Sequence, residues 1–204
     1  MKKRFFSLAL AFLMLLSFGV AASQPSEWAR DEVGKEYPAM FESMQVQFEY
    51  QRPITRAEFA MMAFDVYSHL NGSAPEIEAK NKFVDLGPEI INTFVPLVQA
   101  LGIVNGVSAT EFAPTAGLTR QELCTMLARI YIKLDPSAEG EIIAAAGNID
   151  TFSDSGEIAP WAVDALTLAV SRGIVKGVGE NLLSPTGPVT VEQAMVICSR
   201  IKAN

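Results

Sequence analysis

Two arginines stand where they could bind an anion. Arg56 and Arg120 each follow directly a threonine that begins a predicted helix. A positive charge in the first turn of a helix is unfavourable, because the helix dipole is positive at that end. An arginine at this place in two segments therefore indicates an anionic partner. A guanidinium suits a carboxylate well, since it can donate two parallel hydrogen bonds.

The chain lacks the residues that the common kinds of enzyme catalysis need. The chain has one histidine, His69, and so offers no Ser/His/Asp set. There is no phosphate-binding loop, and the two cysteines do not form a CxxC pair, so a zinc site is not expected. We therefore predict that the chain is not an enzyme and that it holds neither a metal nor a cofactor.

Three capping boxes predict where helices begin. In this motif a threonine oxygen accepts a hydrogen bond from the amide three residues later, and the Glu or Gln at that position accepts one from the threonine amide. The three pairs are Thr55 with Glu58, Thr119 with Glu122, and Thr190 with Gln193. Apolar residues at helical spacing follow each pair, so each motif is expected to start an amphipathic helix.

These helices belong to an internal repeat. A shift of 71 positions brings 102–130 onto 173–201 without a gap and aligns glycines, Pro-Thr pairs and Arg-Ile pairs. A shift of 64 positions aligns a third copy through Thr-Arg, Glu, Met, Tyr and Leu. The predicted repeats are 26–70, which is degenerate, 81–134 and 149–202. Each is expected to fold as helix, loop and helix.

Further positions are assigned within the repeats. Trp28 and Trp161 lie on apolar helical faces, so we favour packing in the core, with stacking against a ligand as the alternative. Asp154 is expected to brace the loop before the first helix of its repeat. Cys124 and Cys198 occupy positions that are apolar in other copies. They could form one disulfide in a secreted protein, but we favour two buried thiols.

The first 23 residues resemble a signal peptide. A basic start, an apolar run over 5–20 and small residues at 20–23 follow the secretory order. A transmembrane anchor is the alternative, but the run is short for one. The chain has 16 basic and 23 acidic residues, and 1–23 hold three of the basic ones, so the remaining chain carries −10. This charge argues against nucleic acid or an anionic membrane as partner.

The repeated motifs resemble the S-layer homology family. That family's repeat has an aromatic-x-Asp, a Trp-Ala, a Gly-Ile-x-x-Gly, a Phe-x-Pro and an Ile-Thr-Arg-Ala-Glu-Phe, in this order. The matching segments are 53–59, 102–106, 112–114, 118–122, 152–154, 161–162 and 173–177. The resemblance implies an all-α fold in which three helix-loop-helix repeats form a pseudo-threefold spindle around a central three-helix bundle.

The resemblance also implies a ligand. Members of this family bind a pyruvylated secondary cell-wall polysaccharide in grooves between repeats. Arg120 is expected to contribute most, because it starts a helix and its neighbouring repeat keeps Trp161 and Gly173. Val191 replaces the arginine in the third repeat, and Ile90 stands in the second repeat where Trp161 stands in the third. The implied ligand-binding residues are Arg120, Arg56, Trp161, Asp154, Gly173 and Trp28.

We therefore expect a secreted, non-catalytic anchoring module at the bacterial cell wall or S-layer surface, with no membrane span once the signal peptide is removed. The alternative is a structural or protein-interaction module at the cell surface, with a surface protein as partner, whose sugar site has decayed. The replacements at Val191 and Ile90 keep that alternative open.

Overall fold

The structure is a computed structural model that describes residues 24–40, 49–87 and 89–201. The predicted signal peptide, 1–23, lies outside the described residues. Within the described ranges the regular structure is helical and β pairing is limited to isolated bridges, which confirms the predicted all-α class. The α-helices are α1 (Glu27–Met40), α2 (Arg56–Asn71), α3 (Glu89–Ala100), α4 (Arg120–Leu134), α5 (Ala138–Ala144), α6 (Val163–Ser171) and α7 (Val191–Ser199).

Three short 3-10 turns complete the described helical structure. They are η1 (Asn148–Thr151), η2 (Ser155–Glu157) and η3 (Pro160–Ala162), and η3 leads directly into α6. Among the helices described, none is both long and apolar enough to cross a membrane.

The predicted capping boxes begin α2, α4 and α7. The hydroxyl oxygens of Thr55 and Thr190 accept hydrogen bonds from the amides three residues later, at 3.3 Å in both cases. In the opposite direction, Glu58, Glu122 and Gln193 each accept a hydrogen bond from the amide of the capping threonine. The three helices therefore start where the sequence predicts, because this signal is local.

A ring of backbone hydrogen bonds joins the segments that precede these helices. The Ile54 amide donates to the Val189 carbonyl at 2.9 Å, and the Val189 amide donates to the Leu118 carbonyl at 3.0 Å. The Leu118 amide closes the ring by donating to the Ile54 carbonyl at 3.2 Å. All three residues are buried. The ring therefore fixes the starts of α2, α4 and α7 beside one another, although more than 60 residues separate them in the sequence.

The first two amides of each of these helices are already hydrogen-bonded. They donate to carbonyls of the next segment around the ring, at 2.9–3.0 Å. The acceptors are Ala116 and Pro114 for α2, Gly187 and Pro185 for α4, and Arg52 and Tyr50 for α7. The first two amides of α4, beside Arg120, are therefore not available to an anion.

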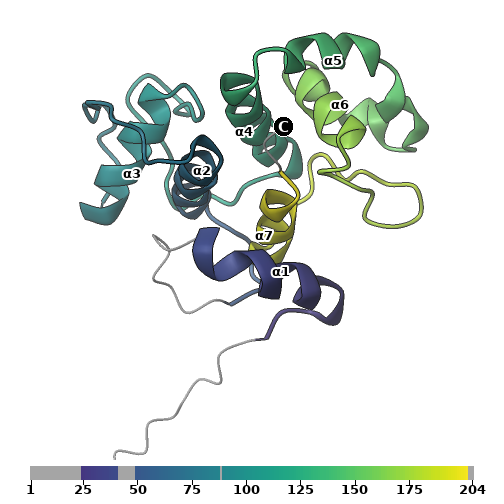
Figure 1. Cartoon of the computed structure of the whole chain (residues 1–204), viewed down its shortest axis with the longest axis horizontal. Helices are drawn as coiled ribbons and strands as arrows, with labels where there is room; N and C mark the ends of the chain where they lie inside the picture. Colours follow the sequence, from purple (N-terminus) through teal and green to yellow (C-terminus); the bar gives the residue numbers. More distant parts are fainter. Residues whose placement is uncertain (1–23, 41–48, 88, 202–204) are drawn as a thin grey trace, which may run out of the picture.

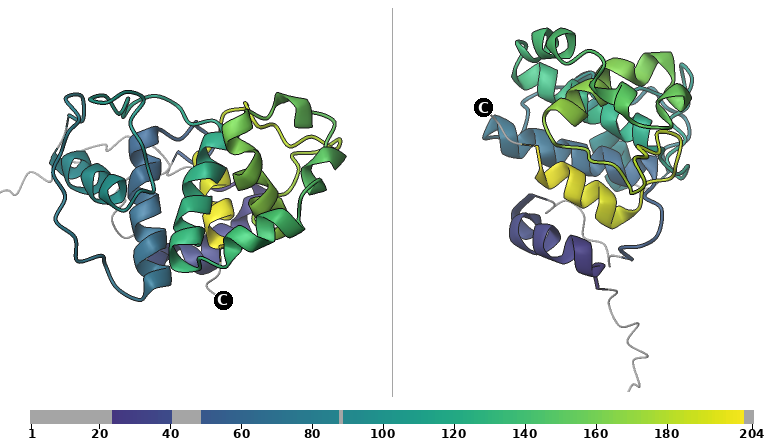
Figure 2. Two further views of the ribbon diagram at one scale, coloured as in Figure 1. Left: turned by 90° about the horizontal axis from the view of Figure 1, so that it is seen from above. Right: turned by 90° about the vertical axis from the view of Figure 1, so that its right-hand side faces the viewer.

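The helices pack in a cyclic order. Helix α3 packs on α2, α6 packs on α4, and α1 packs on α7 (Figure 1). Helix α2 also packs on α4, and Figure 2 shows these two side by side. The first helix of each predicted repeat thus lies on the second helix of the preceding repeat, and α1 on α7 completes the circle. The spindle shape with a central bundle stays a prediction.

The tryptophans differ from the prediction and the thiols agree with it. The prediction that Trp28 and Trp161 pack in the core is wrong, because their residues are 54% and 57% exposed. Cys124 and Cys198 are both buried and free, which agrees with the favoured alternative of two buried thiols.

Candidate ligand-binding grooves

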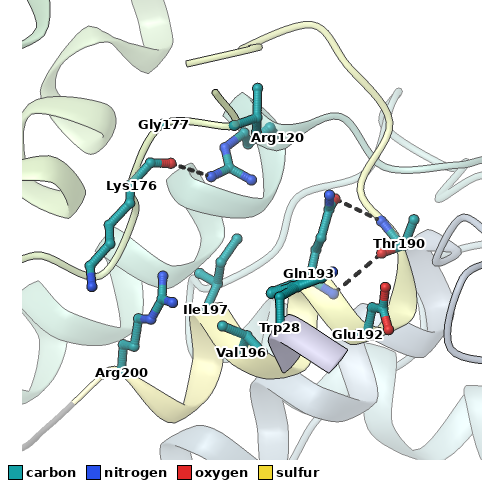
Figure 3. Close-up of a pocket in the computed structure, with 11 residues that line it drawn as sticks. Trp28, Arg120, Lys176, Gly177, Thr190, Glu192, Gln193, Val196, Ile197 and Arg200 are labelled. Atoms are coloured by element: carbon teal, nitrogen blue, oxygen red, sulfur yellow. Dashed lines mark hydrogen bonds between the residues drawn. The ribbon is translucent and has the colours of Figure 1, made fainter. Parts of the chain in front are cut away.

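A groove of about 430 Å³ opens beside Arg120 (Figure 3). Its wall is formed by α7 and by the loop that follows α6, and Trp28 of α1 stands across from that loop. We call it the Arg120 groove. Its lining residues are Trp28, Arg120, Lys176, Gly177, Val178, Thr190, Glu192, Gln193, Val196, Ile197 and Arg200.

A related groove of about 470 Å³ opens beside Arg56. Helix α4 takes the place of α7, and residues of the loop after α3 take the place of the loop after α6. We call it the Arg56 groove. Its lining residues are Arg56, Asn105, Gly106, Val107, Glu122, Thr125, Met126, Arg129 and Trp161. Seven of these nine lie 71 positions before a residue that lines the Arg120 groove, so the two grooves are built alike.

The tryptophans are distributed differently from the prediction. Trp161 was expected beside Arg120, but it lines the Arg56 groove, and Trp28 lines the Arg120 groove. The reason is the cyclic packing, because α6 lies on α4 and α1 lies on α7. Each groove therefore combines an arginine, a loop and an aromatic residue from three different segments of the chain.

Arg120 is a buried cation without a carboxylate partner among the described residues. Only 6% of the residue is exposed. One terminal nitrogen, Nη2, donates to the Lys176 carbonyl at 2.7 Å, while Nε is buried without a hydrogen-bond partner. Burial lowers the pKa of the guanidinium; the charge of Cys124 acts in the opposite direction, and nearby Arg200 lowers the pKa by a smaller amount. The guanidinium stays charged even so, and Arg120 lines the groove without a counter-ion among the described residues.

Arg56 is equally buried but is satisfied within the protein. It is 5% exposed, and its Nε and Nη2 donate to the carbonyls of Phe112 and Asn105 at 3.0 and 2.9 Å. Its Nη1 lies 3.5 Å from a carboxylate oxygen of Glu122. Burial lowers the pKa of Arg56, and the charge of Glu122 acts in the opposite direction. The guanidinium also lies over the Phe112 ring, 4.9 Å from its centre.

The third junction, between α7 and the N-terminal segment, is held by hydrogen bonds within the protein. Val191, which stands in the place of the arginines, is buried. The carboxylate of the next residue, Glu192, accepts hydrogen bonds from the Ser26 amide and hydroxyl, both at 2.8 Å, and from Gln51 at 3.3 Å. This junction therefore offers no free cation among the described residues.

Asp154 braces a loop and lines neither groove. Its two carboxylate oxygens accept hydrogen bonds from the amides of Leu183 and Ser184, at 2.8 and 2.7 Å. Ser184 has a positive φ of 56°, a conformation that L residues seldom adopt, and the carboxylate holds it there. Asp85 makes the corresponding bonds to the amides of 112–113, which hold its pKa below the usual range. The braced loop follows the first helix, whereas we expected the loop before it.

The two glycines of the loop after α6 have different roles. Gly173 ends the helical segment with a φ of +66° and lines neither groove. Gly177 lines the Arg120 groove, and a Cβ at this position would lie 2.9 Å from the Leu182 carbonyl oxygen and 3.2 Å from the Phe152 ring. Gly173 was the glycine expected to bind the ligand, but the glycine that lines the groove is Gly177.

Three further polar residues of the Arg120 groove were missed. Lys176 and Arg200 add positive charge, and Arg200 is held by a bidentate pair with Glu32 at 2.7 and 2.8 Å. Gln193 was interpreted only as a capping residue, yet Figure 3 shows it between the capping threonine and Trp28. Arg200 could have been found from the sequence, because it aligns with Arg129 at the 71-residue shift and both line a groove. Within the described ranges no group of His, Cys, Asp or Glu could hold a metal ion.

Known proteins are similar to this chain in the same region. The family model for the S-layer homology domain matches residues 94–124 and 151–195. The Surface-layer 125 kDa protein of Lysinibacillus sphaericus is 38% identical over 106 residues, which cover 50% of this chain and 8% of that protein. The Amylopullulanase of Thermoanaerobacterium thermosulfurigenes is 30% identical over 151 residues, covering 74% of this chain and 8% of that protein. The Exoglucanase XynX of Acetivibrio thermocellus is 28% identical over 151 residues, covering 74% of this chain and 13% of that protein.

The chain spans only 8–13% of the length of these relatives. The two matched segments contain the second half of α3, the start of α4, all of α6, the loop that carries Gly177, and the start of α7. The chain therefore belongs, through these two segments, to the S-layer homology domain family of cell-surface anchoring modules.

Proposed function

We propose that this chain is a non-catalytic anchoring module that binds an acidic secondary polysaccharide of the bacterial cell wall, of the pyruvylated kind, in the Arg120 groove. One observation carries the proposal: Arg120 lines the groove as a nearly fully buried cation with no carboxylate partner in the described structure. Keeping such a charge out of water costs free energy that no internal ion pair offsets. A carboxylate on a ligand would supply the missing partner.

The rest of the groove suits a sugar. Trp28 offers a large exposed aromatic surface beside the cation, and Val178 is half exposed on the loop opposite. An aromatic face can pack against the C–H face of a sugar ring, while polar groups at the edge bond its hydroxyls. Thr190 and Gln193 line the groove and can serve as such groups.

The net charge of the chain opposes an acidic ligand, so recognition must be local. Without 1–23 the chain carries −10. Salt screens the diffuse repulsion beyond about 8 Å at physiological ionic strength, whereas a partly desolvated guanidinium in contact with its ligand is screened much less. Arg120 and Lys176 therefore act on the ligand at short range, where the repulsion from distant acidic residues is screened.

The proposal extends to the location of the protein and to its organisation. Export after removal of 1–23, residence at the cell wall, and the division into repeats 26–70, 81–134 and 149–202 are parts of it. The family match lies inside the second and third of these repeats, which supports the division.

Binding to isolated wall sacculi tests this function. The purified chain should sediment with sacculi that carry the secondary polysaccharide and stay in solution with sacculi from which it has been extracted. Equal sedimentation with both preparations, or with neither, would contradict the proposal and favour a protein partner instead.

A further inference from the structure

The helices α2, α4 and α7 do not all have the same charge at their third residue, although their capping boxes would allow it. Glutamate stands there in α2 and α4, and glutamine stands there in α7. Both side chains complete the capping box equally, since each accepts a hydrogen bond from the capping threonine amide. The choice between them is therefore free to serve another purpose.

Each of the two glutamates pairs with an arginine that lies outside its own helix. Glu122 lies 3.5 Å from Nη1 of Arg56, across the Arg56 groove. Glu58 accepts two hydrogen bonds from Arg52, one of them at 2.8 Å. Gln193 stands at the same place relative to Arg120, because the two grooves correspond at the 71-residue shift.

Gln193 replaces the carboxylate in α7, and Arg120 beside it is the arginine that lacks a counter-ion in the described structure. The nearest acid that lines the Arg120 groove is Glu192, and its carboxylate is held by Ser26 and Gln51. The other lining cations are Lys176 and Arg200. The lining of the Arg56 groove instead contains Glu122, which pairs with Arg56, together with Arg129.

We propose that the residue at this third helix position decides the charge of the ligand that a groove accepts. Gln193 leaves Arg120 open to a carboxylate, so the Arg120 groove takes the acidic sugar. Glu122 already neutralises Arg56 and would repel a carboxylate, so the Arg56 groove, in which Arg129 is the remaining cation, favours a neutral sugar packed against Trp161. The identity of the ligand as a sugar rests on the proposed function, whereas the difference in charge selectivity does not.

A reciprocal exchange of the two residues tests this without disturbing the helix starts. Gln193→Glu introduces the side chain that α2 and α4 already use in their capping boxes, and Glu122→Gln introduces the one that α7 uses. Glu58→Gln is the matched control, because it makes the same change outside both grooves.

Quenching of tryptophan fluorescence reports the charge of each groove without any sugar. The chain has two tryptophans, one in each groove, so Trp28→Phe and Trp161→Phe leave a single reporter. The ratio of quenching by iodide to quenching by neutral acrylamide should be higher at Trp28 than at Trp161. We expect about a twofold difference, the effect of one unit charge about 8 Å away in water. Gln193→Glu should lower the ratio at Trp28, and Glu122→Gln should raise it at Trp161.

Calorimetric titration with the acidic wall polysaccharide completes the test. Gln193→Glu should weaken binding by about tenfold or more, Glu122→Gln should add a second site, and Glu58→Gln should change nothing. Equal quenching ratios at the two tryptophans, or unchanged binding by Gln193→Glu, would overturn the inference while leaving the proposed function intact. If the parent chain does not bind the polysaccharide but the quenching ratios exchange as expected, the inference stands and the proposed function fails.

Discussion

The contrast between Arg56 and Arg120 gives a prediction about stability as well as binding. We consider replacing each with methionine, which fills similar space without charge. The two residues are 5% and 6% exposed, so the free energy gained by no longer burying a charge is nearly the same at both positions. That contribution cancels when the two variants are compared.

What remains is the difference in the interactions that are lost. Arg56→Met removes two hydrogen bonds from a charged donor to the Phe112 and Asn105 carbonyls, together with the ion pair to Glu122. Arg120→Met removes one hydrogen bond, to the Lys176 carbonyl. A charge-assisted hydrogen bond contributes about 1.5–3 kcal/mol, and an ion pair of this length about 0–1 kcal/mol. Arg56→Met should therefore be less stable than Arg120→Met by about 1.5–4 kcal/mol.

Urea unfolding followed by far-ultraviolet circular dichroism measures this difference. For a slope of about 2 kcal/mol per molar urea, the midpoint of Arg56→Met should lie about 1–2 M below that of Arg120→Met. The midpoint of Arg120→Met should stay close to that of the parent. If Arg120→Met is as unstable as Arg56→Met, then Arg120 serves the fold, and the argument that it is kept for a ligand is refuted.

Three further predictions concern the groove loop, the thiols and the N-terminal ion pair. Gly177→Ala should destabilise the chain by about 1–3 kcal/mol, because its Cβ would meet a backbone oxygen at 2.9 Å; a thermal midpoint equal to the parent's would contradict this. Burial raises the pKa of Cys124 to about 12 and raises that of Cys198 as well, so neither thiol should be alkylated at pH 8 until urea unfolds the protein; fast alkylation of the native chain would contradict it. The hydrogen bond from Arg200 holds the pKa of Glu32 below its unfolded value of 4.5, so this pair stabilises the fold above pH 4.5 and its contribution is lost as the pH falls below that value. Urea midpoints measured from pH 7 to pH 3 should therefore fall less steeply for Arg200→Gln than for the parent, and parallel curves would refute this reasoning.

Features that depend on local sequence could be predicted. The capping threonines mark the starts of α2, α4 and α7 correctly, because the bonds that define them span only three residues. The burial of Cys124 and Cys198 followed from repeat positions that are apolar elsewhere. Arg56 and Arg120 were singled out for their unfavourable place in a helix, and both line grooves.

Features that depend on the cyclic closure of the chain could not be predicted. Trp161 was assigned to Arg120 because their repeats are adjacent in sequence, but η3, which contains Trp161, packs on α4 together with α6 and places Trp161 in the Arg56 groove. Trp28 reaches Arg120 only because α1 packs on α7, which lies far along the chain. Both tryptophans have apolar neighbours at helical spacing, so the sequence pattern alone could not distinguish a groove from a core.

The difference between Glu122 and Gln193 is visible in the sequence, but the sequence alone does not show which arginine each of them faces. Only the placement of each beside the arginine of another segment gives it an electrostatic role. In the same way, the bracing role of Asp154 depends on a loop about 30 residues later, whose amides it accepts bonds from.

The most direct test of the account is the affinity of Arg120→Met for the acidic wall polysaccharide, measured by calorimetric titration beside the parent chain. We predict that the parent binds and that Arg120→Met binds about 10- to 150-fold more weakly, the equivalent of about 1.5–3 kcal/mol for one charge-assisted hydrogen bond. Removing the pyruvyl group from the polysaccharide should weaken the parent's binding by a similar factor and change the variant's little. Equal affinities of Arg120→Met and the parent for the intact polysaccharide would contradict the central claim.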